Sequence, residues 1–245
     1  MNVNRAYIFG VYVGDGYSNK NSVGLNVKDD DFALNFKSIF ENEFKMTGKE
    51  YFYDLHKVEF HNRKLVKYFK NFDIYSIKKY NIPIKCSFLK GFYDSEGSVN
   101  LRIIRGVGRC NRKVELCNTN LKLLKFCKHL LEESGISTRK IDKRMRGTRT
   151  INGRILKPFI FYRFNLSEKK ENFERFNSLI GFSIKRKQDK LNQLIDSYLP
   201  NRYKWPKERE QILKLKGNES YTNIIKKFSH ISPNSIQNWL YHEKR

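Results

Sequence analysis

Two apolar runs of the chain, each containing glycine, end in a single carboxylate. The first covers residues 6–16 (AYIFGVYVGDG) and the second covers residues 87–97 (SFLKGFYDSEG). Three pairs of positions recur at one offset of 81 residues: Gly10 and Gly91, Gly14 and Ser95, Asp15 and Glu96. An internal repeat of this length predicts two similar half-domains.

The hydrophobic pattern after the first run alternates between strand and helix periods. Residues 17–27 place Val23, Leu25 and Val27 on one face, which predicts a short half-buried hairpin. Aspartates at 29–31 are typical of a helix start, and apolar residues follow at helical spacing as far as residue 44. We then expect a strand at 51–60, a helix around 65–69 and a connector at 74–83.

The second half repeats this order of elements. After the second run we expect strands at 99–104 and 113–117 and a helix at 121–131. A long hairpin of residues 138–145 and 158–166 follows, with Asn152-Gly153 as a turn signal, and two helices around 173–180 and 184–195 close the half. The pattern in each half therefore predicts the order helix, two strands, helix, two strands, helix, which is an α+β fold.

The pattern breaks at residues 199–202, and a different module follows. Three short helices are expected at 206–215, 222–228 and 232–241, with Ser232-Pro233 starting the third. This order is typical of a helix-turn-helix, whose last helix enters the DNA major groove; a helical cap without a partner is the alternative. The third helix carries four candidate base contacts: Asn234, Ser235, Gln237 and Asn238. We therefore expect half-domains at residues 1–80 and 81–200 and an all-α module at 201–245.

The repeated small residues predict that the two motif helices pack against each other. Two small residues four apart lie on one helical face and allow two backbones to approach closely. Asp15 and Glu96 would then meet at the C-terminal ends of both helices, where the helix dipole and a second carboxylate disfavour a negative charge. Divalent cations held by carboxylate, carbonyl and phosphate oxygens would relieve that repulsion, and paired metals can assist phosphodiester hydrolysis.

Composition indicates a polyanionic partner. The 245 residues hold 49 Lys+Arg against 25 Asp+Glu, a net charge of +24, and nucleic acid is the commonest partner for such an excess. No uncharged run approaches the ~20 residues of a membrane-spanning helix, and the N-terminus lacks a signal-peptide layout. The four cysteines have no C-x-x-C spacing, and we expect reduced thiols in an intracellular protein.

The two motifs resemble those of the LAGLIDADG homing endonucleases of the single-chain type. Residues 8–16 (IFGVYVGDG) and 89–97 (LKGFYDSEG) carry the resemblance, and residues 180–187 (IGFSIKRK) look like the closing stretch of the family's second half. The resemblance covers about residues 4 to 199. It implies a pseudo-symmetric αββαββα monomer with two saddle-shaped antiparallel sheets over the major groove of double-stranded DNA. It also implies that such an enzyme cuts both DNA strands and leaves short 3′ overhangs.

The resemblance also implies roles for particular residues. Asp15 and Glu96 would bind the metal, with the carbonyls of Gly14 and Ser95 as further ligands. Residues where the second strand meets its helix would orient metal-bound water or the scissile phosphate: Lys28 in the first half, and Asn118 or Thr119 in the second. Val27 departs from the family, which often has a glutamine there. Two or three Mg²⁺ ions are expected, with Mn²⁺ substituting and Ca²⁺ binding without supporting cleavage.

Candidate DNA contacts follow the polar and basic segments of the predicted strands. Residues 138–157 contain many cations but only one acid, Asp142, whereas a merely solvated face would mix the two signs. We therefore expect the second half to supply more of the phosphate affinity. The candidates are Ser18, Asn19, Lys20 and Asn21 in the first half, and Arg102, Arg105, Arg109, Arg112, Lys113, Lys140, Lys143, Arg144, Arg146, Arg149 and Arg154 in the second.

Two other functions remain open from the sequence. The chain resembles bacterial proteins that join a degenerate motif core to a C-terminal helix-turn-helix, which suggests a non-catalytic DNA-binding regulator. The retained acid at both motif ends argues against it. An intron maturase that binds intron RNA is the second alternative, because the same basic sheets could support RNA binding.

Overall fold

The computed structural model describes residues 1–104, 109–151, 154–198 and 206–242. The first half contains seven elements followed by a short 3₁₀ helix, η1 (Ile74–Lys79). In order they are α1 (Val3–Gly14), β1 (Gly16–Ser18), β2 (Ser22–Val27), α2 (Asp30–Phe44), β3 (Lys49–Phe52), β4 (His56–His61) and α3 (Arg63–Asn71). The predicted strand at 51–60 is wrong, because residues 53–55 form a turn that folds this stretch into the β3–β4 hairpin.

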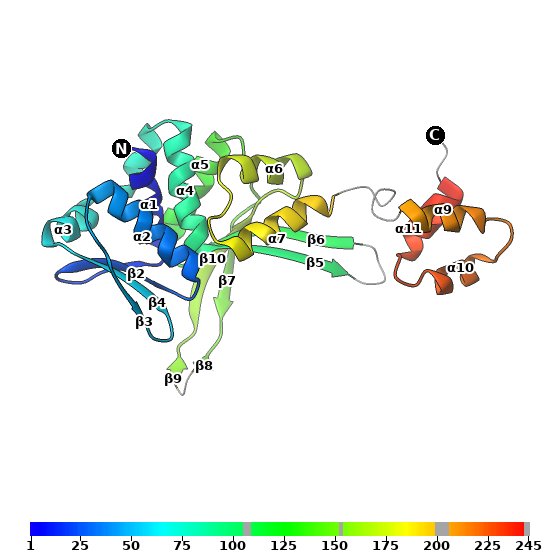
Figure 1. Ribbon diagram of the computed structural model, residues 1–245, viewed down its shortest axis with the longest axis horizontal. Helices are drawn as coiled ribbons and strands as arrows, with labels where there is room; N and C mark the ends of the chain where they lie inside the picture. The colour runs from blue at the N-terminus through cyan, green and yellow to red at the C-terminus, as the bar shows by residue number, and fades with distance from the viewer. Residues whose placement is uncertain (105–108, 152–153, 199–205, 243–245) are drawn as a thin grey trace. The chain divides into compact units, whose positions relative to one another are not determined.

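The second half repeats this order with a longer hairpin (Figure 1). Its elements are α4 (Ile82–Glu96), β5 (Gly97–Ile104), β6 (Arg109–Asn118), α5 (Leu121–Glu133), β7 (Asp142–Arg146), β8 (Arg149–Ile151), β9 (Arg154–Leu156), β10 (Phe159–Asn165), α6 (Lys170–Leu179) and α7 (Lys185–Asp196). The Asn152-Gly153 turn lies outside the described residues. The predicted order of helix, two strands, helix, two strands, helix is confirmed, with β8 and β9 as an extension of the last hairpin.

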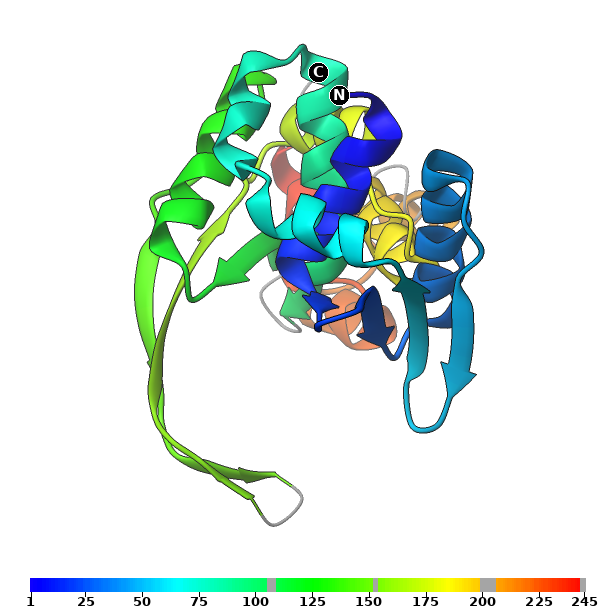
Figure 2. The same ribbon diagram turned by 90° about the vertical axis from the view of Figure 1, so that its left-hand side faces the viewer.

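Helices α1 and α4 pack side by side along the centre of the fold (Figure 2). Asn2 and Asn81 cap their N-termini by accepting bonds from Arg5 N and Ile84 N. A methyl group on Gly10 would collide with the carbonyl oxygen of Phe88, and one on Gly91 would collide with the carbonyl oxygen of Tyr7. A Cβ atom on Gly14 would likewise collide with Ser95, so the contacts advance from Gly10 with Phe88 to Gly14 with Ser95. The two helices are therefore parallel and end at the same place.

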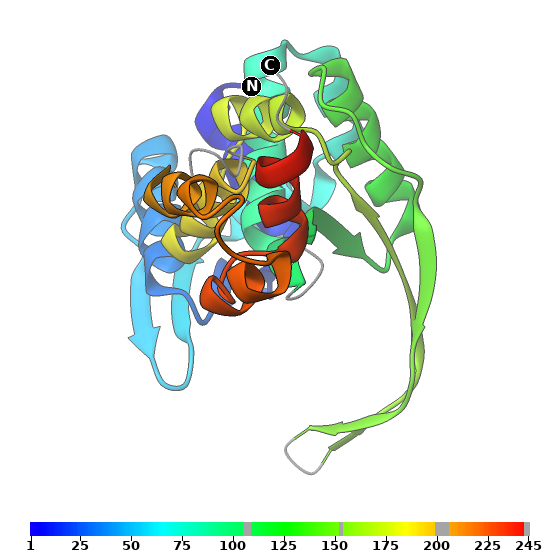
Figure 3. The same cartoon turned by 90° about the vertical axis from the view of Figure 1, so that its right-hand side faces the viewer.

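Each half contributes one four-stranded antiparallel sheet. The strand orders are β1-β2-β4-β3 and β5-β6-β10-β7. In both halves the second strand of the first hairpin therefore pairs with the last strand of the second hairpin, as β2 does with β4 and β6 with β10. Val23, Leu25 and Val27 on β2 and Val114 and Leu116 on β6 are buried, and helices α2, α3 and α5 pack on this face. The alternate side chains lie on the opposite face. Beyond β6, the β7–β10 pair continues with β8 and β9 as a long two-stranded arm (Figures 2 and 3).

The C-terminal module is a group of short helices with its own small core (the helices are drawn in Figure 3). It contains α9 (Pro206–Lys214), α10 (Tyr221–Lys227), α11 (Pro233–Gln237) and the π-helical turn η2 (Asn238–His242). Its buried cluster is Ile212, Ile224, Phe228, Ile231, Ile236, Trp239 and Leu240. Contacts group residues 192–245 with the tip of the β5–β6 hairpin, residues 100–112, and group the remainder as a second unit. None of the helices in the described ranges is long and apolar enough to cross a membrane.

Candidate metal and nucleic-acid site

Asp15 and Glu96 lie together where α1 and α4 end. Asp15 follows the last residue of α1, and Glu96 is the last residue of α4. A Cβ atom added to Gly14 would lie 3.5 Å from Cγ of Glu96. The contact between the C-terminal ends of α1 and α4, where Asp15 and Glu96 lie, is called the seam below. Although one side of Asp15 is exposed, this crowded seam displaces water and raises the pKa of its carboxyl. Burial, together with the charge of Asp15, raises the pKa of Glu96 to about 7.

The two acids differ in how they are held. Asn118, at the end of β6, donates from Nδ2 to Oε1 of Glu96 at 2.8 Å. Val27 occupies the corresponding place at the end of β2, since both residues lie two positions before the cap of the next helix. Its side chain has no donor for Asp15. The structure thus places the Asn118 amide in contact with the Glu96 carboxylate.

Lys28 lies just after β2, on the surface. Its side chain is exposed and makes no hydrogen bond or ion pair with the described part of the chain. Thr119, the alternative to Asn118 in the second half, is also exposed. A phosphate could reach either side chain.

Lys187 is a functional candidate that was not selected from the sequence. Its residue is 7% exposed, and Nζ donates to the carbonyl oxygens of Tyr93 at 3.3 Å, Asp94 at 2.5 Å and Ser95 at 3.5 Å. Burial lowers the pKa of Lys187 to about 8, against the opposing effect of nearby carboxylates. The ammonium therefore caps the C-terminal end of α4, where a cation is favoured. The only sequence signal was its position in the KRK stretch.

Asp94 forms a second buried group next to the seam. Tyr7 Oη donates to its Oδ2 at 2.9 Å, and Ser183 N donates to its Oδ1 at 2.9 Å, while the Ser183 hydroxyl also bonds to Oδ2. Asn35 completes the network by donating to Tyr7 Oη at 2.9 Å. These bonds join the middle of α1, the last turn of α4, helix α2 and the segment just before α7.

The start of α7 also contacts the start of α2. Arg186 makes two bonds to Asp29, Nε to Oδ1 at 2.5 Å and Nη2 to Oδ2 at 2.7 Å, and Lys185 N donates to Asp31 Oδ2 at 2.6 Å. Asp29 was expected to start helix α2, but its side chain makes no capping bond there. It serves instead as the partner of Arg186, which joins the two halves.

The donor atoms at the seam fit a hard divalent cation. Two carboxylates and the nearby carbonyls of Gly14 and Ser95 are oxygen ligands, and Mg²⁺ is commonly held by one or two carboxylates together with substrate phosphates. Within the described residues there is no group of three or more His, Cys, Asp or Glu side chains that could hold an ion alone. A metal here would therefore depend on additional oxygens from a ligand.

The first-half candidates for DNA contact lie in the turn between β1 and β2. Asn19 holds that turn, because its Oδ1 accepts from Asn21 N and Ser22 N, each at 2.8 Å. Lys20 and Asn21 are exposed, whereas the Ser18 hydroxyl bonds to Tyr12 Oη at 3.0 Å. Arg63 was missed, and it donates from Nε to Asn21 Oδ1 at 2.8 Å.

Most of the second-half candidates whose side chains are described are exposed, with one correction. Arg112 is a structural clamp: its guanidinium donates to Ser197 Oγ and to the Ser197 carbonyl, each at 2.7 Å, and lies 4.0 Å from the ring centroid of Tyr198. Lys113 is half-buried. Arg105 lies outside the described residues, as do the side chains of Arg109, Arg149 and Arg154. The exposed candidates are Arg102, Lys140, Lys143, Arg144 and Arg146.

The C-terminal candidates divide into two sets. Asn234, Gln237 and Asn238 are exposed on α11 and at the start of η2. Ser235 is buried, and its hydroxyl lies 2.8 Å from Ser232 Oγ in the helix cap. Ser235 is therefore not on the surface that was expected to contact bases.

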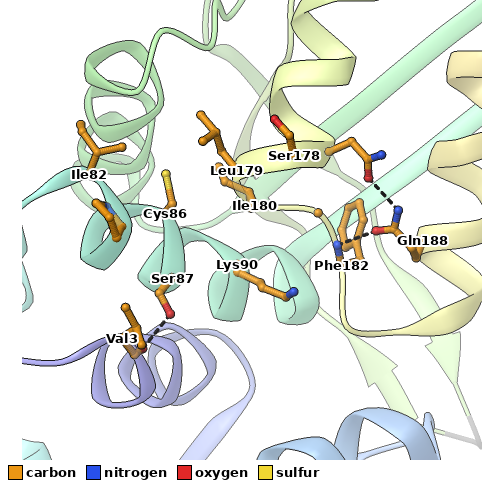
Figure 4. A pocket seen from close by; sticks show the side chains of 13 residues that line it. Val3, Ile82, Cys86, Ser87, Lys90, Ser178, Leu179, Ile180, Phe182 and Gln188 are labelled. Carbon is orange, nitrogen blue, oxygen red and sulfur yellow. Dashed lines mark hydrogen bonds between the residues drawn. The ribbon is translucent and has the colours of Figure 1, made fainter.

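A separate hollow lies at the other end of the motif helices (Figure 4). It measures about 530 Å³ and is lined by residues from the starts of α1 and α4, including Val3 and Ile82, and by the α6–α7 turn. Its lining is mostly apolar, and it contains neither Asp15 nor Glu96. It is therefore not part of the acid pair.

Two saddle-like sheets below a pair of parallel helices that end in acids define a LAGLIDADG fold. Residues 83–181 match the family model of the LAGLIDADG-like domain, so the chain carries such a domain. The homing endonuclease I-DmoI bound to DNA and Ca is similar, with a TM-score of 0.51 and 17% identity over 79% of this chain and 100% of that one. Full-length DUF199/WhiA from Thermatoga maritima gives 0.52 and 10%, over 98% and 90%. These two likenesses show the fold.

Two curated relatives are closer in sequence. Uncharacterized proteins MJ0314 and MJ0398 of Methanocaldococcus jannaschii are each 37% identical to this chain, over 145 and 112 residues. The matches cover 54% and 45% of this chain. They span 54% of the first relative and 37% of the second.

Proposed function

We propose that the protein is a site-specific, metal-dependent endonuclease that hydrolyses both strands of DNA and leaves short 3′ overhangs. The observation that carries the proposal is the meeting of Asp15 and Glu96 at the parallel ends of two repeated helices. A protein that only binds DNA has no need of two neighbouring carboxylates, one of which raises the cost of ionising the other, at the ends of its motif helices.

The nature of the substrate has separate support. A net charge of +24 favours a polyanion, and the arm of the second sheet is exposed on every residue of β7. I-DmoI, which shares the fold, is described bound to DNA and Ca. Double-stranded DNA is the substrate that fits both observations.

The residues near the seam would each have a separate role. Asp15 and Glu96 would hold the ions, Asn118 would orient Glu96, and Lys187 would fix the carbonyl end of α4. The exposed Lys28 would contact a phosphate oxygen near the scissile bond. When bound, Mg²⁺ or Mn²⁺ would polarise the phosphate and stabilise the leaving oxygen, whereas Ca²⁺ would bind without supporting the reaction.

The carboxylates can be tested directly. Asp15→Asn and Glu96→Gln each preserve shape but remove a charge, so we expect cleavage to fall at least about 100-fold while Ca²⁺-dependent target binding changes less than about tenfold. Plasmid cleavage and gel-shift assays would measure the two effects. Glu174→Gln, on the exposed surface of α6, is the matched control and should cut normally. Unimpaired cutting by either seam variant would refute the assigned roles.

The C-terminal module is proposed as an additional DNA-binding element. Its third helix exposes Asn234, Gln237 and Asn238, which are residue types that read base edges. Selection of cleaved duplexes from a randomised library, with and without Mg²⁺, distinguishes the main proposal from its rivals. Specific binding without any cleaved sequence would favour a regulator, and specific retention of intron RNA would favour a maturase.

A further inference from the structure

Two polar atoms in the middle of the second sheet, Arg163 Nε and Asn165 Oδ1, are buried without a hydrogen-bond partner among the described residues. Beside them Glu115 Oε2 is also buried, and it forms an ion pair with Arg163. The β6–β10 register places Asn165 directly opposite Glu115 and places Arg163 one step diagonal from it. A buried unpaired polar group costs roughly 1–3 kcal/mol, so neighbouring ones indicate that the surface awaits a polar ligand.

The three side chains lie on the open face of the sheet. Leu116 on β6 and Phe164 on β10 are directly opposed and buried in the core. Because side chains alternate along a strand, Glu115, Arg163 and Asn165 point the other way. The same face carries Lys113 on β6 and the exposed Arg144 and Arg146 on β7.

Glu115 orients the Arg163 guanidinium without using all of its donors. Arg163 Nη1 is 3.0 Å from Glu115 Oε2, and their side chains are 28% and 17% exposed. The other carboxylate oxygen of Glu115 accepts from the Cys117 thiol at 3.3 Å. A guanidinium has five N–H groups in a rigid fork, so several remain for a ligand.

This set of donors and acceptors matches one kind of base pair. Arginine donates to O6 and N7 of guanine in the major groove, and glutamate accepts from the N4 amino group of cytosine. Glu115 is three residues from Asn118, the partner of Glu96, which is about 10 Å along a strand. The cluster therefore lies within about three base-pair steps of the acid pair.

We propose that Arg163, Glu115 and Asn165 form a reading cluster for a guanine–cytosine pair close to the cleavage position, on the side of the target that the second sheet covers. The cluster rests on the proposed DNA substrate but not on catalysis. Arg163 donates to the guanine, while Glu115 fixes Arg163 and accepts from the cytosine. Asn165 adds a further acceptor.

The test is a comparison of binding preferences for the full chain in Ca²⁺, so that cleavage is not required. Duplexes selected from a randomised library should contain one invariant guanine–cytosine pair. Arg163→Leu should lower affinity for the selected target about 10- to 100-fold and abolish the preference at that pair alone. Arg163→Lys keeps the charge but loses the fork, so it should relax the same position. Lys113→Met, on the neighbouring strand β6 and the same face of the sheet, is the matched control and should weaken binding evenly across sequences.

Each result has a distinct meaning. A uniform loss of affinity in Arg163→Lys and Arg163→Leu, or an unchanged preference profile, would overturn the cluster. Glu115→Gln should also alter the preference at that pair, and a profile identical to that of the unmodified chain would contradict its part. If the unmodified chain selects no duplex at all, the proposed function fails instead. If Arg163→Leu does not fold, Arg163→Lys decides the question.

Discussion

Glu96 shares the seam with Asp15 and has one oxygen bound to Asn118. Burial and the neighbouring charge raise its pKa from the ordinary 4.5 to about 7. Between these two pH values the folded state binds more protons at this group than the unfolded state does. The free energy of unfolding therefore falls as pH rises from about 4.5 to about 7, and the full cost of the ionised pair is present above pH 7.

We expect Glu96→Gln to flatten this dependence. With divalent ions removed by EDTA, the unmodified protein should lose about 1–2 kcal/mol of stability from this group between pH 5 and pH 8, after allowance for solvent screening. The variant should lose correspondingly less. Thermal melts at the two pH values would measure the difference, and equal slopes in both proteins would contradict the environment assigned to Glu96.

At the scale of elements, the close packing of α1 and α4 determines where the acids meet. Gly10 and Gly91 each face a backbone carbonyl of the opposite helix at a separation that leaves no room for a side chain. The Asp94 network and the Arg186–Asp29 pair then tie α7 and α2 to the same helix ends. The geometry of the seam is therefore a property of four helices together.

Gly10→Ala should force the two motif helices apart. The new methyl group meets backbone rather than a flexible side chain, so we expect a loss of about 3 kcal/mol and a fall in Tm of roughly 5–10 °C, together with weaker Ca²⁺ binding. Gly147→Ala is the matched control, because a Cβ there meets nothing within 4 Å. A Gly10→Ala protein as stable as this control would refute the packing constraint.

At the scale of the whole molecule, the net charge and the separate C-terminal module bear on the proposed interaction with DNA. The chain carries +24, and the C-terminal module has a separate core that does not draw on the two sheets. Counterion release makes such binding strongly dependent on salt. On the proposed function, affinity for DNA would be shared between the sheets and the module, whereas Asp15 and Glu96 lie at the ends of α1 and α4.

Deletion of residues 202–245 should weaken target binding but leave metal-dependent cutting. We expect affinity to fall about tenfold or more and the slope of log affinity against log salt to become shallower, because cationic contacts are lost. Binding measured between 50 and 200 mM salt would check both effects. A truncated chain that keeps full affinity would show that the module does not contact DNA.

The repeat, the acids at its ends and the order of elements could be predicted from the sequence, because each depends on spacing between near neighbours. Asp15 and Glu96 stand at equal positions in two copies of one pattern, and helical faces follow from a period of 3.6 residues. The hairpin at 49–61 was missed, since its turn, residues 53–55, contains neither glycine nor proline. The three short helices of the C-terminal module were predicted from the same kind of periodicity.

Only the tertiary structure decided which side chains lie at the seam and which candidate DNA contacts are exposed. Lys187 meets the end of α4 from more than 90 residues away, Arg112 is held by Ser197 instead of facing solvent, and Ser235 is turned into its helix cap. These outcomes depend on strand register and helix docking between distant segments, for which a single sequence gives no local signal. The sequence by itself determined that two acids would end two equivalent helices; packing of those helices decided that the acids share one site.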